Sequence, residues 1–185
     1  MGSALSTGMT TFAQRLFGTL TLDASIAEDI ESDRESARQA LAVILVVACA
    51  GGIAANGLAA ITLPVFFAGA TAAIGGWLVW VLAITVIGTV AVPEPQTHSS
   101  VPELFRTLGF AAAPGVFVAF AAMREVAPFV LKLVAAWMVA AAVMAIRQAL
   151  DYRSTGRAIV VCVLAWLLTF GTLAAALNMR LVSVS

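Results

Sequence analysis

The chain has 185 residues, of which 62% are hydrophobic and 11% are charged, and its mean hydropathy is +1.02. An ordinary soluble domain is about 45–50% apolar and about 25% charged, and a soluble chain of this length cannot bury so much apolar surface. Ten basic and ten acidic residues leave no net charge, so nothing in the composition indicates nucleic acid as a partner. The composition therefore excludes an ordinary soluble domain and indicates an integral membrane protein surrounded by a lipid bilayer.

The segment 1–36 precedes the first apolar run and is predicted to be a short, amphipathic, helical and cytoplasmic segment. Its apolar side chains recur every four residues, as on one face of a helix, at Phe12, Leu16 and Leu20. Residues 25–28 and 32–35 each have the pattern of a capping box, which predicts a short helix at the first and the start of the first span at the second. Two readings stay open for this segment: packing on the protein's own bundle, or a docking surface for a partner.

Five apolar runs are long enough to cross the hydrocarbon core of a membrane, which takes about 20 residues. They cover residues 38–60, 65–92, 104–123, 129–146 and 158–177. Prolines or polar residues separate neighbouring runs. The predicted fold class is therefore an all-α membrane protein, a bundle of five transmembrane helices over residues 37–180, followed by a tail at 181–185.

The basic residues predict the orientation, because arginine and lysine favour the cytoplasmic side of a membrane protein. With a cytoplasmic N-terminus, the cytoplasmic side carries Arg15, Arg34, Arg38, Arg106, Arg147, Arg153 and Arg157. The far side then carries only Arg124, Lys132 and Arg180. This bias predicts a cytoplasmic N-terminus and, with five spans, a C-terminus on the opposite side.

Two features of the third run are candidate functional elements. Residues 100–103 have the pattern of a capping box, and Arg106 follows Glu103 at a spacing that allows an ion pair at the membrane interface. Pro114 and Gly115 lie in mid-span, where proline removes a backbone hydrogen bond and leaves a carbonyl that needs another partner. The Pro-Gly pair predicts either a static kink that improves packing or a hinge or ligand site.

The stretch 147–157 is the richest in polar side chains and is predicted to reach from the end of one span into a cytoplasmic loop. Arg147 and Asp151 have the four-residue spacing of a helical ion pair, with Gln148 in the same stretch. Tyr152 is the only tyrosine and is expected at the interface, where an aromatic ring with a polar tip is favoured. With Arg157, these residues form either a loop that only sets the topology or a recognition patch for a partner protein or a lipid head group.

The sequence holds no pattern that indicates catalysis, a metal or a cofactor. The only histidine, His98, lies in a predicted loop, and no HExxH, GxSxG or Walker pattern occurs. The two cysteines, Cys49 and Cys162, lie in apolar runs and form no CxxC pair. We therefore predict a non-enzymatic protein without catalytic, metal-binding or cofactor-binding residues.

Three stretches carry a family resemblance: Leu-Thr-Leu-Asp at 20–23, Gly-Phe-Ala-Ala-Ala-Pro-Gly at 109–115, and Arg-Gln-Ala-Leu-Asp-Tyr-Arg-Ser-Thr-Gly-Arg-Ala at 147–158. With five spans in this order, the chain resembles the Yip (Ypt-interacting protein) domain family, and more closely its bacterial members. The resemblance implies a five-helix membrane domain with a cytoplasmic N-terminus, in the inner (cytoplasmic) membrane of a bacterium. Eukaryotic members bind Rab-type GTPases in vesicle traffic, but the Asp-Leu-Tyr-Gly-Pro type of stretch associated with them is missing, so that role is not carried over.

Three functional hypotheses remain. The first is a non-enzymatic membrane scaffold or adaptor, acting through protein or lipid contacts at the cytoplasmic face by way of the loop 147–157 and the N-terminal helices. The alternative is a small accessory subunit bound within lipid to a larger membrane complex. The least favoured is an oligomeric small-solute transporter or channel hinged at Pro114, because no polar track follows any span. A membrane or cytoplasmic protein partner is expected, and the oligomeric state, a homo-oligomer included, stays open.

Overall fold

The computed structural model describes the backbone of residues 11–57, 61–95, 97 and 100–184, and the side chains of these residues except 170 and 172–184. Every regular element in this part of the chain is a helix: α1 (Phe12–Leu20), α2 (Ala24–Ser32), α3 (Ser36–Asn56), α4 (Leu63–Val86), the π-helix η1 (Ile87–Ala91), α5 (Val101–Ala111), the 3₁₀-helix η2 (Ala113–Ala122), α6 (Ala127–Ala149) and α7 (Thr155–Val184). The all-α fold class is confirmed. His98 and the final residue of the predicted tail, Ser185, lie outside the described residues.

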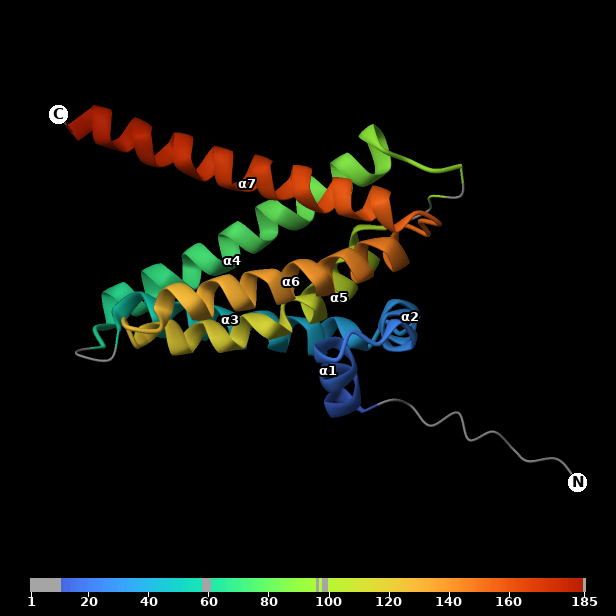
Figure 1. Ribbon diagram of the computed structural model, residues 1–185, viewed down its shortest axis with the longest axis horizontal. Coiled ribbons are helices and arrows are strands. Elements are labelled where there is room, and N and C mark those ends of the chain that lie inside the picture. The colour runs from blue at the N-terminus through green and yellow to red at the C-terminus, as the bar shows by residue number, and fades with distance from the viewer. Residues whose placement is uncertain (1–10, 58–60, 96, 98–99, 185) are drawn as a thin grey trace, which may run out of the picture.

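The long helices run along the long axis of the molecule and alternate in direction (Figure 1). α3, the pair α5 and η2, and α7 lead away from the end that carries α1 and α2, whereas α4 and α6 lead back to it. We call this the α2 end, and the opposite one the Asn56 end. Short connections between neighbours produce this alternation in helical bundles.

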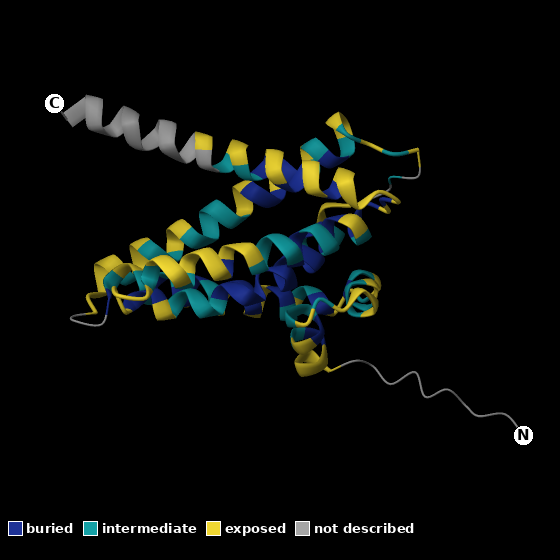
Figure 2. Ribbon diagram, viewed as in Figure 1, coloured by how far each residue is buried: buried dark blue, intermediate teal, exposed yellow. Residues whose placement is uncertain are grey.

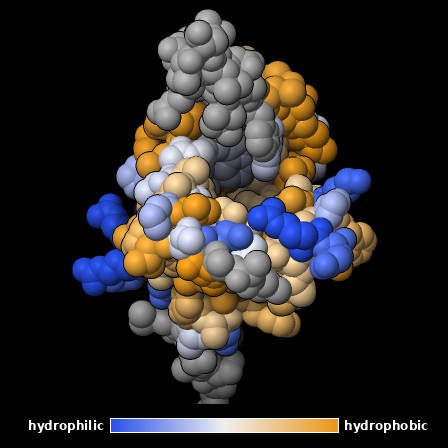
Figure 3. Space-filling model, turned by 90° about the vertical axis from the view of Figure 1, so that its left-hand side faces the viewer, coloured by the Kyte–Doolittle hydropathy of each residue, from blue (hydrophilic) through white to orange (hydrophobic). Residues whose placement is uncertain are grey.

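Within the described residues, three helices are long and apolar enough to cross a membrane: α3, α4 continued by η1, and α6. α5 and η2 together qualify as a fourth span, although the two are bent by 44° at the break between them. In α7 only the part up to Thr169 has described apolar side chains, and that part is shorter than a span. Three or four spans are therefore shown, and the predicted count of five is not confirmed. Seen from the Asn56 end, apolar side chains form much of both flanks of the molecule, with hydrophilic side chains protruding between them (Figure 3).

An aspartate, and not the expected serine, caps α2, and no side chain caps the start of α3. Asp23 accepts a hydrogen bond from the N–H of Ser25 at 3.0 Å where α2 begins. Just before α3, Asp33 accepts from the N–H of Glu35 at 2.9 Å. The two capping boxes predicted near these positions are therefore wrong. Aspartate and serine cap helices about equally well, so the residue types alone did not rank them.

The N-terminal helices pack against the bundle. Leu16, Leu20 and Ile26 contact a buried cluster to which α2, α3, α5 and η2 contribute. Trp137 of α6 donates from its indole nitrogen to the carbonyl oxygen of Leu20 at 3.0 Å. Buried residues are most frequent where α3, α5 and α6 approach this end of the molecule (Figure 2). The structure therefore shows α1 and α2 packed on the protein's own bundle, the first of the two readings of the segment 1–36.

The third apolar run, 104–123, is divided at Ala112 and is not a single straight helix. Pro114 lies at the start of η2 and has no N–H to continue the α-helical pattern of α5. The N–H of Gly115 donates to the carbonyl oxygen of Ala112 at 2.8 Å. A Cβ atom on Gly115 would lie 2.7 Å from a methyl group of Val47, so the glycine lets the backbone approach α3 closely. The chain is thus kinked at the Pro-Gly pair, and its backbone packs tightly there.

Candidate functional site

Arg15 fixes the N-terminal segment in place at the α2 end. Its side chain is only 3% exposed and forms ion pairs with Asp29 and Asp33, each at 2.7 Å. It also donates to the side-chain oxygen of Gln39 at 3.1 Å. One buried guanidinium therefore joins α1 to the last turn of α2, to Asp33 in the α2–α3 connection and to the first turn of α3.

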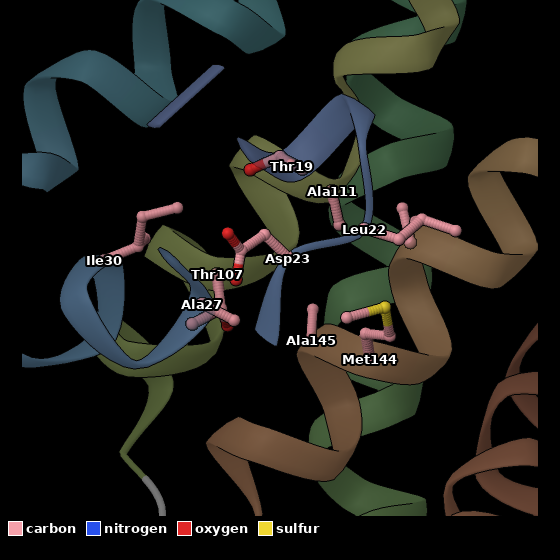
Figure 4. Close-up of a pocket in the computed structure, with 10 residues that line it drawn as sticks. Thr19, Leu22, Asp23, Ala27, Ile30, Thr107, Ala111, Met144 and Ala145 are labelled. Atoms are coloured by element: carbon pink, nitrogen blue, oxygen red, sulfur yellow. The ribbon is translucent and has the colours of Figure 1, made fainter. Parts of the chain in front are cut away.

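The turn between α1 and α2 lies over α5 and α6 (Figure 4). Leu22 in this turn has a φ of 61°, a left-handed conformation that costs a residue with a side chain about 1–2 kcal/mol, and it packs against the bundle core. A cavity of about 20 Å³, room for about one water molecule, remains between the turn and residues such as Thr107 and Ala145. The N-terminal segment is thus closely fitted to the bundle, and α2 becomes the wall of a larger cavity beside it.

A polar cavity of about 460 Å³ lies between α2, the start of α5 and the end of α6. We call it the α2 cavity. Its lining is almost entirely charged or polar: Glu28, Glu31, Ser32, Arg34, Glu103, Arg106, Gln148 and Asp151. Four carboxylates face two guanidinium groups, so the lining is acidic overall and suits a cationic occupant.

Arg106 connects α5 to the end of α2. It is 8% exposed, and its Nη2 atom donates to the carbonyl oxygen of Glu31 at 2.6 Å, while its Nε atom is buried without a partner. The expected ion pair with Glu103 is not formed. The carboxylate of Glu103 instead accepts from the N–H of Ser100 at 2.8 Å, which completes the capping box predicted there. Arg106 therefore holds the wall of the cavity and does not pair along its own helix.

Glu31 has a strongly perturbed carboxyl group. Burial raises the pKa of Glu31 to about 6, assisted by the negative charges of Asp151 and Glu103 and opposed by a hydrogen bond from Gln148 and the charge of Arg106. Carboxylates from α2, α5 and the α6–α7 connection are thus close enough to repel one another. Glu31 gains its charge between about pH 5 and pH 7, and a cationic group in the cavity would favour the charged form.

A second cavity, of about 330 Å³, adjoins the α2 cavity and shares Gln148 and Asp151 with it. Arg147 and Tyr152 also line this second cavity, and the Nε atom of Arg147 lies 3.4 Å from the carbonyl oxygen of Tyr152. Asp151 has a φ of 53°, a left-handed conformation that aspartate adopts more readily than most residues. The sequence-predicted candidates Arg106, Arg147, Gln148 and Asp151 are thus brought together around two joined cavities.

Tyr152 in the α6–α7 connection and Arg157 in the first turn of α7 form a clasp that holds η1 and the residues just after it. The hydroxyl of Tyr152 lies 2.8 Å from the carbonyl oxygens of both Gly88 and Val92, and its single hydrogen serves one of them at a time. Arg157 pairs with the buried carboxylate of Glu94 at 3.5 Å. Tyr152 is 3% exposed. Both side chains are engaged with a segment about sixty residues earlier, and we assign them a structural role.

Sequence reasoning missed the acidic wall of the site. Glu28 and Glu31 are three residues apart on a short helix, a spacing that places both on one face, and this was the available signal. Arg15 gave no signal, because its partners are distant in the sequence. Pro114 and Gly115 lie in mid-span, away from the two polar cavities. Among the described residues, no group of three or more His, Cys, Asp or Glu side chains is arranged to hold a metal ion.

The family model of the Yip1 domain matches residues 17–176. No match to a curated protein or to a solved structure was found. The matched range begins within α1, ends within α7, and contains both polar cavities and the clasp. Because the match covers most of its length, the chain belongs to the Yip1 domain family.

Proposed function

We propose that this chain is a non-enzymatic membrane scaffold whose α2 cavity binds a basic segment of a partner protein. The acidic lining of that cavity is the observation that carries the proposal, because four carboxylates converge there from three separate parts of the chain. Proteins of the Yip1 domain family are generally non-enzymatic and act in membrane traffic, which favours a scaffold over an enzyme.

We also propose that the chain crosses the membrane five times and that its α2 end lies in the cytoplasm. By the resemblance to bacterial members, we propose that this membrane is a bacterial inner membrane. α7 has 30 residues, and at 1.5 Å per residue it extends about 45 Å, more than the roughly 30 Å of hydrocarbon it would cross. The alternating directions of the helices support this count. The excess of arginine on the loops of the α2 end supports the orientation.

A basic partner segment fits the chemistry of the cavity. Glu28 is exposed, and Glu31 is raised in pKa by burial and by neighbouring carboxylates, so an incoming ammonium or guanidinium group would relieve repulsion within the lining. Complementary charge of this kind contributes specificity and speeds association. Since α2 and the α6–α7 connection both line the site, a bound segment would join the N-terminal region to the bundle.

The test uses the full-length protein in nanodiscs of uncharged phosphatidylcholine and a fluorescent hexa-arginine peptide as the probe. Glu28→Gln combined with Glu31→Gln should weaken peptide binding by about tenfold, because one exposed and one partly buried charge are removed. The matched control combines Glu35→Gln with Glu125→Gln, two exposed carboxylates that do not line the cavity. Equal affinities for the two double variants would contradict the proposal.

A pH series gives the same experiment a second readout. A raised carboxyl pKa means that the folded protein holds the proton more tightly than the unfolded chain, so ionisation of Glu31 opposes folding as the pH rises from about 4.5 to 6. A cation reverses this preference, so peptide affinity should rise between pH 5 and pH 7 by about tenfold at most. Glu31→Gln should flatten this rise. If the peptide affinity of the wild type does not change between pH 5 and pH 7, Glu31 does not contribute to binding the peptide.

The two alternatives receive less support. An accessory subunit would place its contacts on the exposed flanks of the spans, where residues such as Leu82, Leu164 and Leu167 are also what lipid would cover. A transporter would need a polar route through the middle of the bundle. The cavity found there is lined almost entirely by apolar side chains.

A further inference from the structure

The helix α1 turns its most exposed aromatic side chain away from the protein. Phe17 is 69% exposed, whereas Arg15 and Gly18 on the other face of the helix are buried. Arg15 is the only charged residue of α1, and its charge is paired with Asp29 and Asp33. The outer face of α1 therefore carries a large apolar side chain and no charge, and what this face meets depends on how deep α1 lies in the membrane.

Two contacts fix the position of α1 along the bundle. Trp137 of α6 donates from its indole nitrogen to the carbonyl oxygen of Leu20, the last residue of α1, at 3.0 Å. The ring of Phe12, the first residue of α1, has its centroid 6.1 Å from that of Phe110 on α5. Both ends of α1 are thus held by the bundle, and α1 stands across the direction of the long helices (Figure 1).

Both contacts lie far from the ends of helices that can cross a membrane. Trp137 precedes Ala149, the last residue of α6, by 12 residues, which is about 18 Å. Phe110 follows Val101, the first residue of α5, by nine residues, which is about 14 Å. If the last turn of α6, with Arg147, lies among the head groups, Trp137 is still about 13 Å inside the hydrocarbon. Because the centre of the hydrocarbon is about 15 Å from its edge, these depths put α1 at the level of the acyl chains.

The polar groups at the two ends of α1 form hydrogen bonds within the helix and its caps. The N–H of Thr11 donates to the side-chain oxygen of Gln14 at 2.7 Å, and the N–H of Gln14 donates back to the hydroxyl of Thr11 at 3.3 Å. At the other end, the hydroxyl of Thr21 donates to the carbonyl oxygen of Phe17 at 3.0 Å. Polar groups in hydrocarbon need such internal partners, because no water is at hand. The hydrogen bonding of α1 therefore suits the depth that its contacts give it.

We propose that α1 is inserted into the lipid leaflet at the α2 end, where Phe17 contacts the acyl chains. Helices that lie on a membrane surface commonly use lysine or arginine to attract anionic head groups. The one arginine of α1 is 3% exposed and paired within the protein, so the attraction is to hydrocarbon and not to head-group charge. Because three residues separate α1 from α2, the inserted helix also holds α2 at the membrane. This inference does not depend on what the α2 cavity binds.

Spin labelling of the full-length protein in phosphatidylcholine nanodiscs measures what surrounds Phe17. In a background with both native cysteines replaced by alanine, a nitroxide is attached to Phe17→Cys. Leu45→Cys, on the exposed flank of α3, gives the value for lipid, and Glu35→Cys, ahead of α3, gives the value for water. The readout is the ratio of collisions with oxygen, which is enriched in hydrocarbon, to collisions with a water-soluble nickel chelate. We expect the ratio at position 17 to match position 45 and to exceed position 35 by about tenfold, with or without added phosphatidylglycerol.

Hydrogen exchange gives a second readout that needs no label. Phe17 is 69% exposed, so replacing it removes little packing within the protein, and a large effect must come from the surroundings of the side chain. Phe17→Asp places a carboxylate among acyl chains, which is costly, whereas Phe17→Leu keeps an apolar side chain. We expect exchange in residues 12–20 to quicken by at least about tenfold in Phe17→Asp and to stay near the wild-type rate in Phe17→Leu.

Three outcomes would overturn the proposal. A nitroxide at position 17 that meets the nickel chelate as often as one at position 35 would show that α1 faces water. A nitroxide at position 17 that meets neither reagent would show that a second copy of this chain or another protein covers the face. Equal exchange rates in Phe17→Asp and Phe17→Leu would show that the side chain at position 17 does not anchor α1 in the lipid.

Discussion

At the scale of single residues, Arg15 joins three helices of the fold, although no sequence pattern singled it out. Its side chain is almost fully buried, whereas its partners Asp29 and Asp33 keep about a third of their side-chain surface exposed. Removing one partner of a fully buried ion pair costs about 3–5 kcal/mol, and the partial exposure here reduces that figure to about 1–3 kcal/mol. Because Arg15 joins α1 to α2 and α3, losing its ion pairs should mainly weaken the packing of the N-terminal segment against the bundle.

We therefore expect Arg15→Met to loosen α1 and α2 while the spans stay folded. Backbone hydrogen exchange in residues 12–32 should quicken by about tenfold to a hundredfold, since each factor of ten corresponds to about 1.4 kcal/mol. The matched control is Arg38→Met, because Arg38 is 88% exposed and meets Glu35 at 3.6 Å in a surface pair that contributes little. Exchange that quickens equally in both variants would show that Arg15 does not hold the segment.

At the scale of elements, the positions of the long helices followed from the sequence because hydrocarbon demands long apolar runs. The predicted runs 38–60 and 129–146 overlap α3 and α6 to within a few residues. The π-helix η1 and the 3₁₀-helix η2 were not predicted, because their residues have the same apolar character as an α-helical span. For η1 the distinguishing feature is tertiary, because the hydroxyl of Tyr152 bonds to the carbonyl oxygens of Gly88 and Val92. For η2 the sequence predicted a kink or hinge at Pro114, but not the 3₁₀-helix that begins there.

The sequence predicted some residues of the candidate site but not how they are arranged. The stretch 147–157 was correctly singled out as polar, but the sequence did not show that it divides into cavity-lining residues and a clasp. That division depends on contacts across about sixty residues, such as Tyr152 with Gly88, and no local periodicity records contacts of that kind. The acidic face of α2 was visible in the sequence, whereas the partner surfaces on α5 and α6 that turn it into a cavity were not.

The clasp leads to a prediction about η1. Tyr152→Phe removes the only donor that this hydroxyl offers to the carbonyl oxygens of Gly88 and Val92, which should cost about 1–2 kcal/mol. We expect faster hydrogen exchange in residues 87–95 and a melting temperature lower by a few degrees. Thr89→Val is the matched control, because the hydroxyl of Thr89 donates only within its own helical stretch, to Thr85 at 2.7 Å. If Tyr152→Phe and Thr89→Val behave alike, the hydroxyl of Tyr152 does not stabilise η1.

At the scale of the whole molecule, the alternating helices place the parts of the proposed binding site at one end. α2, the start of α5, the end of α6 and the start of α7 meet there, so the α2 cavity exists only when the chain crosses the membrane in that order (Figure 1). If α7 did not cross the membrane, the α2 cavity would remain intact. The C-terminus would then lie on the same side of the membrane as the α2 end.

Cysteine labelling of intact cells tests that arrangement. In a background with Cys49→Ala and Cys162→Ala, single cysteines are introduced by Ser32→Cys at the α2 end, Glu125→Cys at the Asn56 end, and Ser183→Cys near the C-terminus. Five spans with a cytoplasmic N-terminus predict that a membrane-impermeant maleimide modifies the second and third but not the first. Modification at position 125 alone would leave α7 uncrossed and reduce the count to four. Modification at position 32 alone would invert the orientation, and with it the compartment from which a basic partner reaches the α2 cavity.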